Sequence, residues 1–254
     1  MDKDLQPRFE WLLRMGDTSL ILAQRLGEWC GKGPALEEDM ALTNTALDLL
    51  GQARLWLAYA CEVEGAERDE DQLAFLRDSR EFRNVLLVER PNSNYAHTLM
   101  RQFYFDAWHH LALRELEESA DPRIGEIASK AVKEATYHLR RSSDLVVRLG
   151  DGTRQSHDMV QSAADSLWTY TGELFRNDEI DAPLAAEGIV FEPASLHERW
   201  SSYVNAVFAA ATLQTPPSNT YMQLGGKQGV HSEHLGYLLA EMQVLQRTHQ
   251  GAKW

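Results

Sequence analysis

The stretch LDLLGQA, residues 47–53, lies in the middle of a long helical pattern and decides which kind of bundle this chain can form. Apolar residues recur around it every three or four positions, as they do on the buried face of an amphipathic helix. We expect that helix to run from about residue 35 to residue 64, a length typical of a bundle. Its inward positions in this stretch are Leu49 and Gln52. Leucine has no donor atom and glutamine offers only a neutral carbonyl oxygen, so neither is a strong ligand for a divalent metal.

Helical periodicity extends over the rest of the chain, and strict alternation is almost absent. A first amphipathic pattern runs from Trp11 to Trp29. Further helical patterns are expected at about residues 71–88, 95–119, 123–149, 156–175, 193–213 and 232–249. The four long patterns can pair as two antiparallel hairpins joined by a longer crossover. The sequence therefore predicts an all-α fold, a ferritin-like long four-helix bundle with additional C-terminal helices.

We expect these helices to form a single domain over residues 1–254. The core bundle is predicted at about 8–149 and the additional helices at about 155–249. No internal repeat, low-complexity tract or obvious linker interrupts the sequence. With 254 residues, 44% of them hydrophobic, the chain can bury a substantial core.

The composition argues against several classes of function. A formal net charge of −13 disfavours nucleic-acid binding, which needs a clustered basic surface. No apolar run approaches the roughly 20 residues of a membrane span, and the first residues, MDKDLQPRFEW, do not read as a signal peptide. The two cysteines, Cys30 and Cys61, do not make a disulfide framework. We therefore expect a soluble, cytoplasmic protein that binds neither nucleic acid nor a membrane.

A di-iron centre in such a bundle has strict requirements. It needs a Glu from each of two helices and an E-x-x-H motif from each of the other two. The i, i+3 step places Glu and His on one helix face, and the hard carboxylate oxygens neutralise the metal charge. The first 150 residues, which hold the four long helices, contain no E-x-x-H motif. The bundle is therefore predicted to carry a degenerate di-iron site.

Several distinctive strings add a family resemblance. They are QRLGEWCG (24–31), LDLLGQAR (47–54), LAFLRD (73–78), LLVERPN (86–92), FDAWH (105–109), KEATYHLR (133–140), ELF and DEID within 173–181, GGKQG (225–229) and HSEHLG (231–236). Through them the chain resembles, almost from end to end, the C-subunit family of the bacterial phenylacetyl-CoA epoxidases. These are multicomponent, ring-epoxidising monooxygenases of phenylacetate degradation.

The resemblance implies a pair of homologous ferritin-like subunits. In such a pair, the A-type subunit carries the di-iron centre and performs the chemistry, whereas the C-type subunit binds it and is structural. By resemblance we expect this chain to be the structural, non-catalytic member of a heterodimer or a dimer of heterodimers. The small B-type subunit is a further candidate partner. The chain itself is expected to hold no cofactor and no catalytic residue, with di-iron and most of the contacts to phenylacetyl-CoA in the A-type subunit.

The family's metal-bearing pattern can be laid on this chain residue by residue. It falls on Ser19, Leu49, Gln52, Asp106, Ala135 and His138. Only Asp106 and His138 keep side chains that bind metals well, and one carboxylate with one imidazole cannot hold two irons. A buried Asp106 would need a hydrogen-bond partner, and we expect His138 or Gln52 to supply it.

Two alternatives remain for the metal chemistry. A metal-dependent ferritin-like oxygenase could use an unusual ligand set of Asp106, Glu134 and His138. The pairs Asp106–His110 and Glu134–His138, each four residues apart, could also form a relocated single-metal site. Such spacing is common in helices, so surface pairing plus one core histidine is the competing interpretation.

The last part of the chain holds two further motifs. His231 and His234, with Glu233 between them, have the spacing of a ligand pair, although Ser232 could instead cap a helix there. The loop GGKQG at 225–229 could hold a phosphate through backbone N–H groups and a lysine. It is not a Walker A motif and follows no predicted strand, so a loop at a subunit interface is the alternative.

The resemblance also suggests where an acyl-CoA could touch this chain. The candidate contacts are Glu81, Phe82, Arg83, Asn84, Ala182, Pro183 and Leu184. Neither segment has a sequence signature for CoA, and ordinary inter-helix turns are the alternative. A third hypothesis for the whole chain is a free-standing structural or carrier protein without an oxygenase partner.

Overall fold

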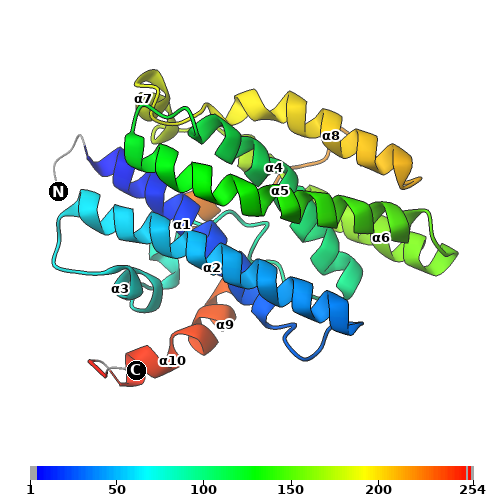
Figure 1. Ribbon diagram of the computed structural model, residues 1–254, viewed down its shortest axis with the longest axis horizontal. Helices are drawn as coiled ribbons and strands as arrows, with labels where there is room; N and C mark the ends of the chain where they lie inside the picture. The colour runs from blue at the N-terminus through cyan, green and yellow to red at the C-terminus, as the bar shows by residue number, and fades with distance from the viewer. Residues whose placement is uncertain (1–4, 250, 253–254) are drawn as a thin grey trace. The chain divides into compact units, whose positions relative to one another are not determined.

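The computed structural model describes residues 5–249 and 251–252, which form helices joined by turns and loops (Figure 1). No strand occurs among these described residues, so the predicted all-α class is confirmed. The chain divides into two compact units: unit 1 is Met1–Pro91 with Gly225–Trp254, and unit 2 is Asn92–Leu224. This division does not test the prediction of a single domain, which stays a prediction.

The framework of unit 1 is a hairpin of two long helices. Helices α1 (Gln6–Gly27) and α2 (Leu36–Glu64) lie side by side (Figure 1). Their close approach depends on Gly16, because a Cβ atom there would lie 2.7 Å from a methyl carbon of Leu57. Helix α2 ends at Gly65, whose φ of 66° is the left-handed conformation that closes many helices. The first predicted hairpin is therefore confirmed.

The rest of unit 1 consists of short helices. They are α3 (Glu70–Phe75), η1 (Ser79–Glu81), η4 (Gly226–Gln228), α9 (Glu233–Met242) and α10 (Val244–Thr248). The predicted helix at 71–88 was wrong, because the chain after η1 continues as turns and irregular backbone. Side chains from α1 satisfy that backbone: the N–H of Val85 donates to Thr18 Oγ1 (3.3 Å) and that of Arg83 to Asp17 Oδ2 (2.8 Å).

The predicted C-terminal helix at 232–249 is divided at Gln243. This side chain is only 3% exposed and turns away from the helix to donate two hydrogen bonds. Its amide nitrogen reaches the carbonyl oxygens of Ala74 (3.1 Å) and Arg77 (3.0 Å). At the break between α9 and α10, the Gln243 side chain therefore links the C-terminal segment to α3 and to the turn that follows it.

Unit 2 contains the second long hairpin and the additional helices. Its elements are α4 (Tyr95–Leu116), α5 (Pro122–Gly150), α6 (Arg154–Trp168), η2 (Gly172–Phe175), α7 (Asp181–Ala186), η3 (Pro193–Leu196) and α8 (His197–Ala210). Helices α4 and α5 lie side by side (Figure 1). Asn94 caps α4 by accepting from the N–H of His97 (2.9 Å), and Asp121 caps α5 just before Pro122. Both long helices predicted here are confirmed.

An aromatic core holds the additional helices against α4. The ring of Tyr104 lies 5.7 Å from that of Trp168 on α6 and 6.2 Å from that of Phe208 on α8. The indole N–H of Trp200 donates to the carbonyl oxygen of Tyr104 (3.1 Å), and Tyr104 Oη donates to the carbonyl oxygen of Ala164 (3.2 Å). Buried aromatic residues with satisfied polar atoms give a well-defined arrangement of α4, α6 and α8.

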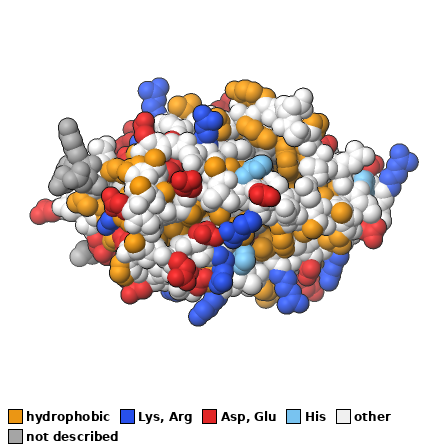
Figure 2. Space-filling view, turned by 90° about the horizontal axis from the view of Figure 1, so that it is seen from above, with side chains coloured by type: hydrophobic (Ala, Val, Ile, Leu, Met, Phe, Trp, Pro, Cys, Tyr) orange, Lys and Arg blue, Asp and Glu red, His pale blue; other side chains and the backbone are white. Residues whose placement is uncertain are grey.

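The surface carries charges of both signs. On the face shown in Figure 2, acidic and basic side chains are interspersed with apolar ones. No helix among residues 5–249 and 251–252 has the length and apolar character that a membrane crossing requires. Cys30 and Cys61 are free thiols.

Candidate functional site

The carboxylate of Asp106 is the centre of a buried polar cluster in unit 2. Asp106 lies on α4 and is 1% exposed. Its Oδ1 accepts a hydrogen bond from Gln102 Nε2 (2.7 Å), and its Oδ2 accepts one from Ser142 Oγ on α5 (2.8 Å). Both donors are buried as well. The carboxylate therefore joins the two long helices of this unit.

The donors to Asp106 differ from those we expected. Burial and hydrogen bonding of Asp106 were predicted, but the donors found within unit 2 are Gln102 and Ser142 rather than His138. Ser142 lies one helical turn after His138, and Gln102 lies one turn before Asp106, so helix geometry brings both within reach. Burial raises the pKa of Asp106 from 3.8 to about 6, against the opposing effects of the His138 charge and the two hydrogen bonds.

A second histidine, His109, lies three residues after Asp106. It is 1% exposed, and its ring centroid lies 4.7 Å from that of Phe105. Neither ring nitrogen has a hydrogen-bond partner among the described residues. Burial lowers the pKa of His109 to about 3, so the ring is neutral. Burial also lowers the pKa of the neighbouring His110.

The other positions predicted for a degenerate di-iron site are all buried. Ser19 on α1 is 1% exposed, and Leu49 and Gln52 on α2 are 0% and 2% exposed. In unit 2, Ala135 and His138 on α5 are 1% and 2% exposed. Each of these side chains thus lies on an inner face of its own helix.

Metal-binding side chains do not cluster in the part of the chain that the structure describes. In residues 5–249 and 251–252, no three or more His, Cys, Asp or Glu side chains are grouped so that they could hold a metal ion. The alternative ligand set of Asp106, Glu134 and His138 is therefore not assembled. The same holds for His231, Glu233 and His234 as a set.

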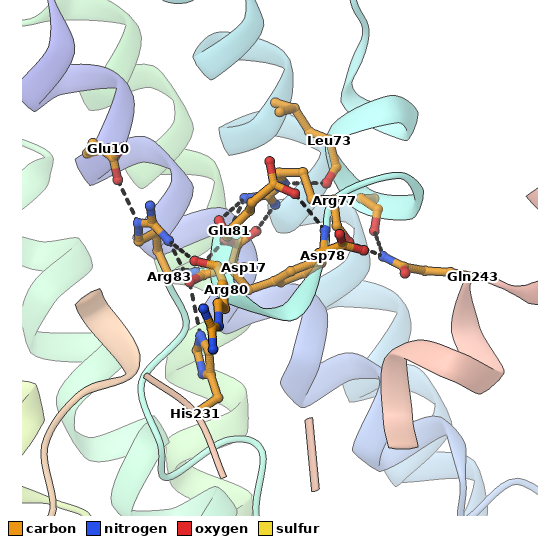
Figure 3. Close-up of polar contacts among 12 residues, drawn as sticks. Glu10, Asp17, Leu73, Arg77, Asp78, Arg80, Glu81, Arg83, His231 and Gln243 are labelled. Atoms are coloured by element: carbon orange, nitrogen blue, oxygen red, sulfur yellow. Dashed lines mark hydrogen bonds and ion pairs between the residues drawn. The ribbon is translucent and has the colours of Figure 1, made fainter. Parts of the chain in front are cut away.

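A second buried polar network lies in unit 1, around the loop that contains η1 (Figure 3). Arg77 donates to both carboxylate oxygens of Asp17, and the two side chains are 4% and 0% exposed. Arg77 also donates to the carbonyl oxygen of Glu81 (3.0 Å), and its guanidinium lies 4.4 Å from the ring centroid of Phe82. The loop after α3 is thereby fixed to α1 by a buried ion pair.

Most of the predicted CoA contacts in this loop are engaged in the fold. Phe82 and Asn84 are 0% exposed, and Arg83 forms an ion pair with Glu10 (2.7 Å). Glu81 is exposed and lines a groove of about 690 Å³ between the η1 loop and α9. The second predicted segment lies in unit 2 at the start of α7, where Ala182 and Pro183 are exposed and Leu184 is buried.

The groove between the η1 loop and α9 continues past Arg80 into a second hollow of about 550 Å³. Arg80 and Gly236 line both parts. The guanidinium of Arg80 is exposed and forms no hydrogen bond or ion pair with any described residue. Leu239 and Val244 are apolar residues of the groove's lining.

The motif around His231 has a structural role in unit 1. His231 Nδ1 lies 2.9 Å from Glu89 Oε2, and its Nε2 lies 3.0 Å from the carbonyl oxygen of Phe82. The N–H of Ser232 donates to the other oxygen of Glu89 (2.6 Å). Ser232 does occupy the N-cap position of α9, but its hydroxyl makes no capping hydrogen bond. The His231–His234 motif therefore joins α9 to the loop before Pro91.

The glycine loop at 225–229 packs against the same loop. A Cβ atom at Gly226 would lie 2.2 Å from the carbonyl oxygen of Asn84, and one at Gly229 would lie 2.3 Å from that of Arg80. Gly229 also has a φ of 77°, which favours glycine. These glycines permit close backbone contact, and Lys227 between them is only 7% exposed. The loop is thus built for packing and does not present an open phosphate cradle.

The described residues form an all-helical fold with two long hairpins, which belongs to the ferritin-like class. The family model described as phenylacetic acid catabolic protein matches residues 1–254, and the chain belongs to this family. It is 52% identical over 244 residues to the C subunit of 1,2-phenylacetyl-CoA epoxidase from Escherichia coli (strain K12). That alignment covers 96% of this chain and 98% of the relative.

Proposed function

We propose that this chain is the structural, non-catalytic subunit of a phenylacetyl-CoA epoxidase in aerobic phenylacetate degradation. In this proposal it binds and stabilises a homologous catalytic subunit that carries the di-iron centre. A relative named as the C subunit of such an enzyme is 52% identical over 96% of this chain, which supports a component role of this kind. The partner, the hetero-oligomer and a cytoplasmic location are parts of the same proposal.

The observation that carries the proposal is the chemistry of the six buried positions. Four of them, Ser19, Leu49, Gln52 and Ala135, offer no carboxylate or imidazole. The carboxylate oxygens of Asp106 are occupied by hydrogen bonds from neutral side chains. A di-iron centre needs several carboxylates to neutralise its charge, and this set of residues does not fit that requirement.

The same substitutions suit a bundle without metal. A cluster of buried carboxylates would repel one another, and each would cost several kcal/mol to remove from water. Leu49, at 0% exposure, instead contributes about 1.5–3 kcal/mol through burial of its side chain. We therefore assign to this chain the role of holding its partner's helices in place, while the partner provides the metal chemistry and most of the acyl-CoA contacts.

Co-expression with the di-iron homologue tests the proposal. The two chains should elute together at micromolar concentration, with iron bound to the partner and not to this chain. Ring epoxidation of phenylacetyl-CoA should be absent with this chain alone and should require both chains. Separate elution, or two tightly held irons on the isolated chain, would contradict the proposal.

A further inference from the structure

The ring of His231 in unit 1 is held between two hydrogen-bond acceptors. Its Nδ1 lies 2.9 Å from Glu89 Oε2, and its Nε2 lies 3.0 Å from the carbonyl oxygen of Phe82. A carbonyl oxygen has no proton to give, so Nε2 must be the donor in the second contact. The side chains of His231 and Glu89 are 4% and 0% exposed, so bulk water cannot replace either contact.

The surroundings of Glu89 require a proton on Nδ1 as well. The Glu89 carboxylate accepts hydrogen bonds from the N–H of Ser232 (2.6 Å) and from Asn84 Nδ2 (3.2 Å). These donors favour the ionised carboxylate, which has no hydrogen of its own to offer the ring. A neutral imidazole carries a proton on only one nitrogen, so it can donate to Phe82 or to Glu89 but not to both. The two contacts together therefore require the charged, doubly protonated ring.

Charges of both signs surround this ring. Glu89 favours its charged form, whereas two nearby guanidinium groups oppose it. Arg83 donates to the same carbonyl oxygen of Phe82 (3.0 Å), and Arg25 of α1 donates to the backbone oxygens of Glu89 (2.9 Å) and His234 (3.3 Å). The other ionisable groups on the surrounding elements are Asp17, Arg77, Arg80, Lys227, Glu233 and the His234 side chain. Side chains of arginine, lysine, aspartate and glutamate do not ordinarily titrate between pH 6 and 9, whereas an imidazole in water loses its charge near pH 6.5, a value of about this size being usual.

We propose that Glu89 and His231 form a proton-dependent latch, which holds the segment 225–232 against the loop before Pro91. When the ring loses its second proton, a nitrogen lone pair faces either the carboxylate or the carbonyl oxygen, so one of the two contacts becomes repulsive. The latch is therefore closed at low pH and opens as the pH rises through the titration of the ring.

Opening should be confined to one end of the C-terminal segment. The other end is held by Gln243, whose amide does not titrate and donates to the carbonyl oxygens of Ala74 and Arg77. Within the segment 225–232, the N–H of Val230 donates to the carbonyl oxygen of Gly225 (2.9 Å), so this loop is closed on itself and can move as one piece. The same loop lines the hollow beside Arg80, which opening of the latch would widen.

Nitrogen NMR of the folded chain, with labelled histidine, measures the state of the ring directly. At pH 6 both nitrogens of His231 should carry hydrogen, and the signal is assigned by its absence from His231→Gln. As the pH rises to 9, one ring proton should be lost. Over the same range the Ser232 amide should exchange at least about 10-fold faster relative to its intrinsic rate, the effect of losing one hydrogen bond to a charged group. The amides of α10 should keep their protection.

Two variants separate the latch from a general effect of pH. In Glu89→Gln the new amide nitrogen can donate to a neutral Nδ1 while Nε2 still donates to Phe82, so the protection of Ser232 should no longer change between pH 6 and 9. His234→Gln is the matched control, because the His234 side chain makes no hydrogen bond with any described residue, and it should behave as the unaltered chain does.

Four results would overturn the proposal. They are a His231 ring that is neutral at pH 6, a ring that is still charged at pH 9, a ring that titrates without a change at the Ser232 amide, and an equal pH dependence of that amide in the unaltered chain and in Glu89→Gln.

Discussion

Replacing Arg77 by methionine should destabilise unit 1 strongly. Arg77 donates to both oxygens of the Asp17 carboxylate, and neither side chain is more than 4% exposed. Methionine fills a similar volume but donates nothing, so Asp17 would keep only the N–H of Arg83 (2.8 Å). The variant thus leaves a buried carboxylate without its counter-ion.

Breaking a buried ion pair from one side costs about 3–5 kcal/mol. For a chain of this size each kcal/mol lowers the unfolding midpoint by about 2–4 °C, so a fall of about 6–20 °C is expected. The control is Arg199→Met, which removes an ion pair with Glu115 whose side chains are 49% and 40% exposed. Exposed pairs of that kind contribute about 0–1 kcal/mol.

Urea unfolding followed by circular dichroism measures both variants. A double variant, Asp17→Leu with Arg77→Met, should recover part of the loss because it removes the unpaired charge as well. A loss of unfolding free energy below about 1 kcal/mol for Arg77→Met, or one equal to that of Arg199→Met, would refute this role of the buried ion pair.

Two further predictions concern a buried acid and two glycines. The folded pKa of Asp106, about 6, lies above its ordinary value of 3.8, so its contribution to stability is fully present below about pH 4 and is lost as the pH rises to 6. Asp106→Asn should remove this loss of about 3 kcal/mol from the pH profile of the unfolding free energy; identical profiles would contradict the assignment. Gly226→Ala should destabilise unit 1, because the new Cβ would lie 2.2 Å from a backbone oxygen. In Gly51→Ala, within α2, the new Cβ meets nothing within 4 Å, so this variant should stabilise the folded state by about 0.5–1 kcal/mol. Thermal melts of the two glycine variants should shift in opposite directions, and a shift of the same sign would count against the packing described.

The long helices could be predicted because their apolar periodicity is strong and their caps are local. Asn94 and Asp121, for example, lie directly before the helices they cap. The loop after α3 could not be predicted in this way. Val85 and its neighbours form an apolar run that resembles a helix, yet a hydrogen bond from the Val85 N–H to Thr18, 67 residues away, holds it in another conformation. No local pattern contains such a partner.

The buried cluster shows a similar limit. The resemblance gave the position of Asp106, and the burial of a helical carboxylate implied a hydrogen-bond donor. The choice among Gln102, Ser142 and His138 depended on side-chain directions on two packed helices, which spacing alone does not fix. The Asp-x-x-His step from Asp106 to His109 was visible in the sequence, but only the packing against Phe105 reveals a neutral, buried ring.

The packing of the glycine loop against the loop before Pro91 has a consequence for folding during synthesis. Part of the packing and hydrogen bonding of residues 84–89 comes from Gly226, His231 and Ser232, which are translated much later. A ribosome must therefore synthesise all of Asn92–Leu224 before the opening hairpin receives its final segment. The first 91 residues translated alone should remain incompletely folded, and a nascent chain stalled before residue 225 should be far more sensitive to protease in this region than the released protein.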